Sequence, residues 1–343
     1  MDLPAARELK SRLLSDVQTA GGDDRPIRQF AVGIAPRTDG EYAVAIRFTE
    51  EQPAEDSLGQ LAADSPGDLD VRVIGVIRPQ TAPDVADLQS RQRPVYPGVS
   101  VSHPDVTAGT LGGFVTVDRA LHVLSNSHVL ADSGQAAVGD DMLQPGVADG
   151  GQTGADVVGT LAAFAPLLDD QPNLVDAAIS ALADGIESDP AGYPGGALGA
   201  VVADPPADSL VEKVGRTTGL TAGRVTAFEV DGITVQYDVG VLTFDNQIEI
   251  EGSGDLPFSE GGDSGSVIWT TTERAPFGLL FAGSTQGGSN GRGLTYANPL
   301  SVVLSELGAE WAGAPEPPVD PEPPAEPEPP ADPEPLAEPA RSR

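Results

Sequence analysis

The feature that most constrains the fold is a series of short hydrophobic runs between residues 109 and 310. The runs are four to seven residues long, and glycine-rich turns separate them. Many short strands with little helix between them are typical of a β-barrel or a β-sandwich. We expect strands at residues 111–117, 121–125, 157–161, 177–182, 224–230, 233–237, 247–250, 266–270 and 278–282. Residues 300–307 predict a C-terminal helix.

Residues 1–90 follow a different pattern, which predicts a small α/β appendage. Apolar residues at helical spacing predict a helix over 4–18. Two alternating runs, 30–34 and 42–48, flank a turn at Asp39-Gly40 and predict a hairpin. A short helix at 52–63 and a strand at 71–77 complete the unit. It contains no catalytic constellation, and the sequence leaves open whether it gates a cleft or mediates self-association.

The rest of the chain divides into two regions of different composition. Residues 78–108 are rich in proline and read as a connector, and we start the main β domain, 91–312, within it. The tail, 313–343, holds 12 of the 32 prolines and eight acidic residues. Such a segment cannot bury a core, so we expect a disordered, extended tail that either keeps the protein soluble or serves as a docking arm.

Charge and composition exclude several classes of function. The formal net charge is −33, which argues against nucleic acid and anionic membranes as partners. The absence of cysteine excludes disulfides and a cysteine nucleophile, and with three histidines we expect no metal and no other cofactor. No apolar stretch is long enough to span a membrane, and no secretory signal pattern begins the chain, so we expect a cytoplasmic location. The oligomeric state stays open, and the acidic excess fits either a high-salt protein or an ordinary acidic surface.

Three motifs in the β region carry residues of complementary chemistry. They are Leu124-Ser125-Asn126-Ser127-His128-Val129-Leu130, Asn173-Leu174-Val175-Asp176-Ala177-Ala178-Ile179 and Gly261-Gly262-Asp263-Ser264-Gly265-Ser266. A serine hydroxyl is a weak nucleophile that needs a neighbouring base, and imidazole suits that task. A carboxylate on the far ring nitrogen orients the imidazole. The set predicts Ser264 as nucleophile, His128 as base, Asp176 as its orienter, and the amides of Gly262 and Ser264 as an oxyanion hole.

The order His, Asp, Ser on a β background resembles the trypsin-like serine proteases. The segment Gly215-Arg216-Thr217-Thr218-Gly219 is similar to one in the streptogrisin and α-lytic branch. Over residues 20–308 the chain most resembles the NARROW LEAF-type trypsin-like proteins of plants and their prokaryotic relatives. Shared segments are the three motifs, Gln144-Pro145-Gly146, Asp149-Gly150-Gly151 and Phe258-Ser259. The resemblance implies a mainly β, chymotrypsin-like fold of two six-stranded barrels, with His128 and Asp176 from the first barrel and Ser264 from the second.

The resemblance also implies a cationic partner for Asp263. In the streptogrisin type this partner is an internal basic side chain just before the Gly-Arg-Thr-Thr-Gly segment, and Lys213 stands there. We therefore expect Lys213 to pair with Asp263, with Arg216 as the rival partner. An internal partner removes the need for an activating N-terminal cleavage.

Only a few positions in the sequence indicate the substrate specificity. By the resemblance, Phe258 stands at the base of the primary pocket, and Phe281, Ala282 and Gly283 form its wall. None is charged, which favours a neutral, apolar substrate residue. The alternative assignment for Phe258 is the barrel core. Phe281 departs from the family, which usually has a small hydroxyl residue there that supports the catalytic aspartate.

The sequence thus predicts a serine endopeptidase that acts on protein or peptide substrates through an acyl-enzyme. Two alternatives stay open: a non-catalytic or latent binding module with the same fold, and an esterase for small acyl substrates. The remaining histidines, His103 and His122, lack the spacing of metal ligands, and we expect structural roles for both.

Overall fold

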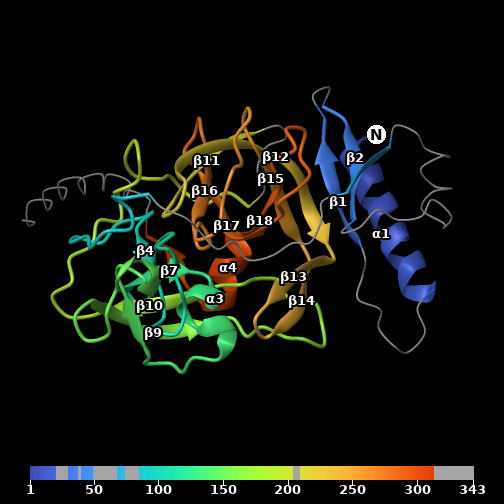
Figure 1. Ribbon diagram of the computed structural model, residues 1–343. Coiled ribbons are helices and arrows are strands. Elements are labelled where there is room, and N and C mark those ends of the chain that lie inside the picture. Colours follow the sequence, from blue (N-terminus) through green and yellow to red (C-terminus); the bar gives the residue numbers. More distant parts are fainter. Residues whose placement is uncertain (21–29, 38–39, 49–67, 74–84, 204–208, 313–343) are drawn as a thin grey trace, which may run out of the picture.

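The computed structural model describes residues 1–20, 30–37, 40–48, 68–73, 85–203 and 209–312 (Figure 1). The helix predicted at 52–63 and the tail at 313–343 lie outside the described residues. The fold is mainly β and chymotrypsin-like, as expected. Among the described residues, no helix is long and apolar enough to cross a membrane.

The second barrel is a closed ring of six strands. Their order is β11 (Leu210–Gly215), β16 (Val267–Thr270), β17 (Pro276–Gly283), β18 (Thr295–Pro299), β15 (Gln247–Gly252) and β12 (Gly219–Asp231). Antiparallel pairing of β11 with β12 closes the ring. The barrel lies at the centre of the molecule in Figure 1, in yellow to red.

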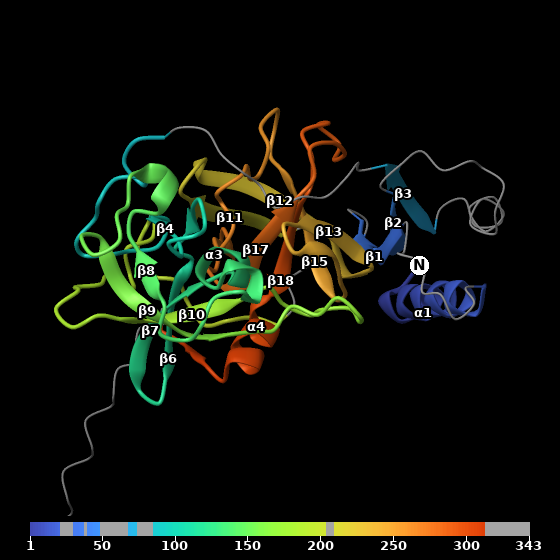
Figure 2. The same ribbon diagram turned by 60° about the horizontal axis from the view of Figure 1, so that its bottom comes forward.

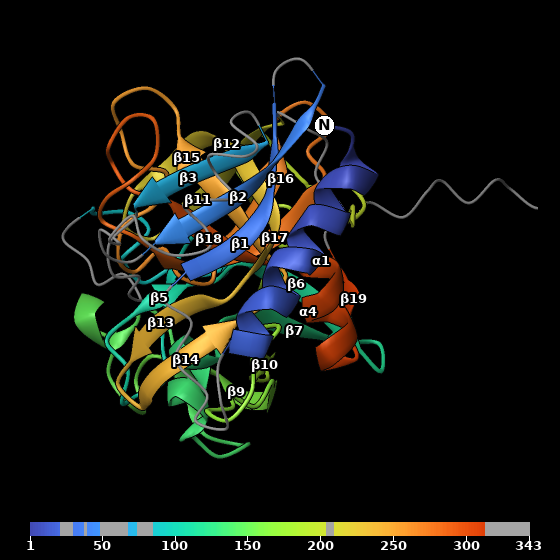
Figure 3. The same ribbon diagram turned by 90° about the vertical axis from the view of Figure 1, so that its right-hand side faces the viewer.

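The N-terminal strands extend the sheet of this barrel. Strand β1 (Phe30–Pro36) pairs with β12, β2 (Tyr42–Phe48) pairs antiparallel with β1, and β3 (Leu69–Val73) pairs parallel with β2. The predicted hairpin therefore exists, and it belongs to a nine-stranded sheet. Helix α1 (Leu3–Ala20) lies alongside β1 and β2 (Figure 3). The domain boundaries at residues 90 and 312 stay predictions.

The first barrel is built on a second sheet of six strands. Their order is β19 (Glu310–Trp311), β6 (Gly113–Val117), β7 (Ala120–Ser125), β10 (Ala178–Leu182), β9 (Val157–Phe164) and β8 (Asp141–Leu143). A bridge between Ser102 and Leu143 joins β8 to the small ribbon of β4 (Ser100–Val101) and β5 (Gly109–Thr110). Figure 2 shows this sheet, in green, beside the second barrel.

Short elements connect and cover the barrels. Strands β13 (Ile233–Tyr237) and β14 (Gly240–Phe244) form a separate hairpin, and α3 (Ser127–Leu130) follows β7. Helix α4 (Leu300–Leu307) follows β18 and packs with β17 and β18. Two 3-10 turns span Asp132–Gly134 and Val147–Asp149.

Strands that the sequence did not predict contain polar residues whose partners come from distant segments. Strand β11 includes Glu212 and Lys213, and Trp269 Nε1 donates a hydrogen bond to Glu212 Oε2 at 3.1 Å. Strand β18 includes Asn298, which is buried. A polar residue inside a strand weakens the alternating pattern, and only the folded barrel provides its partner.

A buried ion pair joins the N-terminal strands to the second barrel. Arg47 on β2 donates to both carboxylate oxygens of Glu249 on β15, at 2.6 and 2.7 Å, and both side chains are fully buried. Arg47 also donates to Asp70 on β3 at 2.9 Å. Such a bidentate pair is geometrically specific, and losing one partner leaves the other charge buried without compensation.

We predict that Arg47→Met destabilises the protein strongly, by about 3–5 kcal/mol, because Glu249 keeps its buried charge. The free energy of unfolding from urea titration measures this loss. Arg7→Met is the matched control, since the Arg7–Glu229 pair lies at the surface, where a salt bridge contributes about 0–1 kcal/mol. Equal stability of the two variants would contradict the prediction.

Candidate active site

His128 and Asp176 form a close pair in the first barrel. Strand β7 ends at Ser125, and the turn into α3 places His128 beside the segment that leads into β10. The distance from His128 Nδ1 to Asp176 Oδ2 is 2.5 Å, and the His128 amide donates to Asp176 Oδ1 at 3.1 Å. The carboxylate therefore contacts both the ring and the backbone of the histidine, which fixes the orientation of the ring.

Three further residues complete the surroundings of Asp176, which is fully buried. The Tyr237 hydroxyl donates to Asp176 Oδ2 at 2.7 Å, and the Asp176 amide donates to Asn298 Oδ1 at 3.0 Å. The Asn126 side-chain amide donates to the Asp176 carbonyl at 2.6 Å. The sequence analysis missed Tyr237 and Asn298 because both are distant in the chain from the motifs, and it assigned no role to Asn126 although that residue lies within the first motif.

The environment of Asp176 favours its ionised form. Burial alone would raise the pKa of this carboxyl, but the charge of His128 and the hydrogen bonds from His128 and Tyr237 outweigh burial. The pKa of Asp176 therefore lies below its ordinary value. A carboxylate that stays charged next to the imidazole can stabilise an imidazolium.

Ser264 lies on a tight turn of the second barrel that packs directly against the first barrel. The Thr110 amide donates to the Ser264 carbonyl at 2.8 Å. A Cβ atom at Gly112 would lie 1.9 Å from the Gly265 carbonyl oxygen, so the two backbones approach as closely as glycine allows. Ser264 Oγ lies 3.4 Å from the Phe281 carbonyl, and among the described residues no hydrogen bond joins it to His128. Such bonds are often long before substrate binds.

The turn that precedes Ser264 exposes two backbone donors. The Asp263 amide donates to the Glu260 carbonyl at 3.1 Å, and Gly262 has a φ of 90°, which favours glycine. Thr217 Oγ1 donates to the Gly261 carbonyl at 2.6 Å, which fixes the orientation of the peptide between Gly261 and Gly262. Within the described chain, the amides of Gly262 and Ser264 have no hydrogen-bond acceptor. An oxyanion hole consists of unpaired backbone amides beside the nucleophilic serine, and the Gly262 and Ser264 amides match that arrangement.

Asp263 is fully buried and has a complete set of partners. Lys213 Nζ lies 3.2 Å from Asp263 Oδ2, and both side chains are fully buried. Thr218 Oγ1 donates to Oδ2 at 2.7 Å, and the amides of Thr217 and Thr218 donate to Oδ1 at 3.0 and 3.1 Å. Burial lowers the pKa of Lys213, and the Asp263 charge opposes that shift.

Arg216, the rival partner for Asp263, pairs with a different carboxylate. Its guanidinium donates to both oxygens of Asp149, at 2.8 and 2.6 Å. Both side chains are nearly buried. This pair links the second barrel to the loop that contains Asp149-Gly150-Gly151.

The residues expected to form the primary specificity pocket are all buried. Phe258 packs in the core of the second barrel and contacts the ammonium group of Lys213, 5.9 Å from the ring centroid. Phe281 packs against Phe244, with ring centroids 4.7 Å apart, in a second hydrophobic cluster that also contains Ala282 and Tyr237. The structure therefore places Phe258 in the barrel core, the second of the two alternatives for this residue. Gly283 ends strand β17 and is buried.

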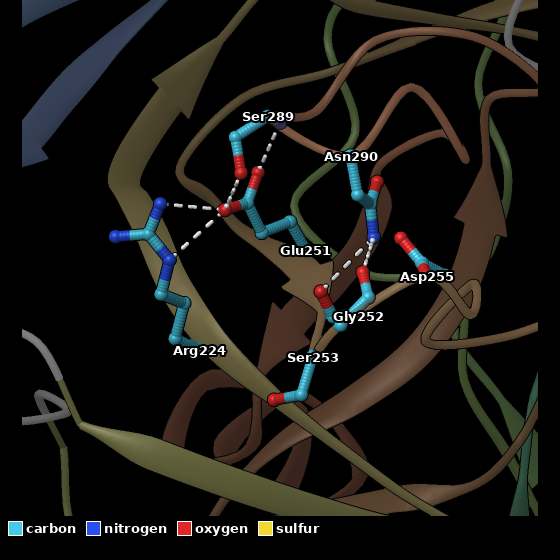
Figure 4. Close-up of a pocket in the computed structure, with 8 residues that line it drawn as sticks. Arg224, Glu251, Gly252, Ser253, Asp255, Ser289 and Asn290 are labelled. Carbon is cyan, nitrogen blue, oxygen red and sulfur yellow. Dashed lines mark hydrogen bonds and ion pairs between the residues drawn. The ribbon is translucent and has the colours of Figure 1, made fainter.

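A polar hollow of about 470 Å³ lies near the two loops that follow β15 and β17 (Figure 4). Arg224, Ser289 and the Ser289 amide all contact the Glu251 carboxylate, and Asn290 donates to the carbonyls of Gly252 and Gly254. His128, Asp176 and Ser264 do not line this hollow. Its polar groups bond one another, so they brace the two loops.

The side chains of the other two histidines contact groups other than His128, Asp176 and Ser264. His122 Nδ1 is 2.9 Å from the Ala120 carbonyl, and His103 Nε2 is 3.4 Å from Asp140 Oδ2. In the described part of the chain, no group of three or more histidine, aspartate or glutamate side chains could hold a metal ion.

The comparisons with known proteins give structural similarities at low identity. A scan against protein-family models finds no match, and a search of curated proteins finds none. The chain is similar to Thermobifida fusca protease A, at 17% identity and a TM-score of 0.43 over 63% of this chain and 97% of that one. It is also similar to a glutamic acid-specific serine protease that uses a histidine triad in substrate binding (23% identity, TM-score 0.45, 63% and 100% covered). A third similar structure is Cellulomonas bogoriensis chymotrypsin, at 19% identity and a TM-score of 0.43 over 64% of this chain and 99% of that one. Membership of the NARROW LEAF-type subgroup stays a prediction.

We predict that Asp176→Asn lowers stability at neutral pH and that this loss shrinks on acidification. Because the pKa of Asp176 is lowered in the folded protein, its contribution is present above the ordinary carboxyl pKa and is lost as pH falls through the folded value. Urea unfolding of both proteins between pH 3 and pH 7 (roughly the range in which carboxyl groups titrate) measures the difference. Asp105→Asn is the control, since that side chain is 81% exposed. A loss independent of pH would contradict the prediction.

Proposed function

We propose that the protein is a serine endopeptidase that cleaves peptide bonds through an acyl-enzyme. The observation that carries the proposal is the pair of His128 with the buried Asp176 carboxylate, together with a Ser264 turn in which the amides of Gly262 and Ser264 are unpaired. A nucleophile, an oriented base and an oxyanion hole are the parts that acyl transfer requires. A cytoplasmic location and the absence of nucleic-acid and membrane partners stay predictions from composition.

The reaction follows from these groups. Ser264 Oγ attacks the substrate carbonyl carbon as His128 Nε2 takes the hydroxyl proton, and Asp176 stabilises the imidazolium. The oxyanion accepts hydrogen bonds from the Gly262 and Ser264 amides, and each such donor contributes about 3–4 kcal/mol in the transition state. His128 then protonates the leaving amine as the C–N bond breaks. Water, deprotonated by His128, releases the acyl group, and the proton returns to Ser264.

The contacts of Asp263 support a site that forms without an activating cleavage. Its carboxylate has an internal cation, Lys213, and three donors from Thr217 and Thr218. Because Asp263 directly precedes the nucleophile, this set of contacts holds the Ser264 turn in place. A new N-terminus is not needed as counter-ion.

The preference for a neutral, apolar residue before the cleaved bond rests on the resemblance alone. Phe258, Phe281 and Ala282, which the resemblance assigns to the primary pocket, are buried in hydrophobic clusters. A panel of peptides that differ only in the residue before the cleaved bond tests the preference.

One observation favours the alternative of a latent protein. Ser264 Oγ contacts the Phe281 carbonyl and has no hydrogen bond to His128 among the described residues. In a latent protein this arrangement would persist with substrate present. An esterase for small acyl groups would share the machinery, and nitrophenyl esters compared with extended peptides separate the two activities.

We predict that a fluorophosphonate probe labels the protein stoichiometrically on Ser264, because an activated nucleophile and an oxyanion hole are both needed for that reaction. Mass mapping of the adduct identifies the residue, and Ser264→Ala is the control. Labelling in low and in multimolar salt tests whether screening of the −33 net charge is required. A folded protein that stays unlabelled in both conditions would favour the latent or binding module.

We predict that Lys213→Met lowers the labelling rate of Ser264 by at least about tenfold and destabilises the protein by about 3–5 kcal/mol, because Asp263 loses its buried counter-charge. Lys10→Met is the matched control. Lys10 is the other lysine of the chain and also pairs with a carboxylate, Asp231, at 2.9 Å, but on helix α1. Circular dichroism confirms that each variant is folded. Labelling of Lys213→Met at the wild-type rate would show that the pair does not support the site.

A further inference from the structure

Tyr237 is the one side chain of the β13–β14 hairpin that contacts both His128 and Asp176. Its hydroxyl donates to Asp176 Oδ2, the same oxygen that lies 2.5 Å from His128 Nδ1. Its ring meets the His128 ring edge to face, with centroids 5.7 Å apart and an interplanar angle of 64°. Tyr237 thus contacts both members of the pair that would take and return the serine proton.

The phenol of Tyr237 is protonated, and therefore a hydrogen-bond donor, at neutral pH. Burial and the neighbouring Asp176 carboxylate raise the pKa of Tyr237 well above its ordinary value. A protonated hydroxyl facing a carboxylate makes a charge-assisted hydrogen bond, which is about twice as strong as a neutral one. Among the described residues, the titratable groups that act on Asp176 are His128 and Tyr237.

The core of the second barrel holds Tyr237 in place. Its ring packs against Phe244, with centroids 6.0 Å apart, and Phe244 packs against Phe281. The same core includes alanines from the N-terminal strands β1 and β2, at positions 31, 35 and 45. The hydroxyl therefore has a fixed position relative to Ser264, whose Oγ faces the Phe281 carbonyl.

We infer that Tyr237 is a positioning residue of the triad, which holds the Asp176 carboxylate and the His128 ring in register with Ser264 across the two barrels. This inference rests on the proposed function. The inference also explains how Asp176 is supported although Phe281 lacks the hydroxyl that the resemblance leads one to expect there. In this protein the donor to the aspartate is Tyr237 on strand β13.

Tyr296 provides a matched control within the same protein. It is also a fully buried tyrosine of this core, and its hydroxyl donates to a buried carboxylate, Glu249 Oε2, at 3.0 Å. Its pKa is likewise raised well above the ordinary value by burial and that carboxylate. Removing either hydroxyl costs one buried hydrogen bond to a carboxylate, but only Tyr237 contacts the triad.

The experiment compares Tyr237→Phe with Tyr296→Phe in the full chain. For Tyr237→Phe we expect kcat on a peptide substrate to fall about ten- to one-hundred-fold with KM unchanged, the range for one hydrogen bond to a charged group. The acid limb of kcat/KM should move to higher pH, since an Asp176 carboxylate without the phenol is less stabilised and the pair accepts a proton more readily. Tyr296→Phe should change neither kcat nor the acid limb. A kcat for Tyr237→Phe within twofold of wild type, or equal losses in both variants, would overturn the inference.

A second measurement needs no activity and separates this inference from the proposed function. The NMR resonance of the proton between His128 Nδ1 and Asp176 Oδ2 should shift in Tyr237→Phe relative to wild type and stay unchanged in Tyr296→Phe. If wild type fails to label with fluorophosphonate but the shift appears, the proposed function fails and the positioning role stands. If wild type labels and no shift appears, the positioning role fails and the proposed function stands.

Discussion

The site depends on one buried carboxylate at the junction of the two barrels. Asp176 has no access to solvent, so its charge is tolerable only with several donors. His128 supplies two contacts from the first barrel, while Tyr237 supplies one from the second, and Asn298 holds the backbone of the aspartate. Satisfying this charge therefore fixes the relative position of the barrels and, with it, the histidine.

A second buried carboxylate, Asp263, orders the other half of the site in the same way. Lys213 neutralises it, and Thr217 and Thr218 saturate its oxygens. Thr217 has a further role, as its hydroxyl fixes the peptide before Gly262. The chain has only two lysines, and both are buried and paired with carboxylates.

The N-terminal strands contribute to the surroundings of this site through hydrophobic packing and a buried ion pair. They continue the sheet of the second barrel and contribute alanines to the core that holds Tyr237. Arg47, with its buried bidentate pair to Glu249, ties them to β15. Sequence reasoning treated residues 1–90 as a separate appendage because a hairpin pattern is local, whereas the pairing of β1 with β12 joins segments about 200 residues apart.

The sequence by itself determined the mainly β character, most of the strands and the three motifs, because hydrophobic alternation and glycine turns act over a few residues. The resemblance that the sequence carries also indicated Lys213, which stands just before the Gly215–Gly219 segment. Only the tertiary structure decided that Arg216 pairs with Asp149, that Phe258 lies in the core, and that Tyr237 supplies the hydroxyl to Asp176. Those contacts join residues that are far apart in the chain and come together only when the barrels pack. A buried polar group then forms a hydrogen bond or ion pair with the partner that the packing brings within reach.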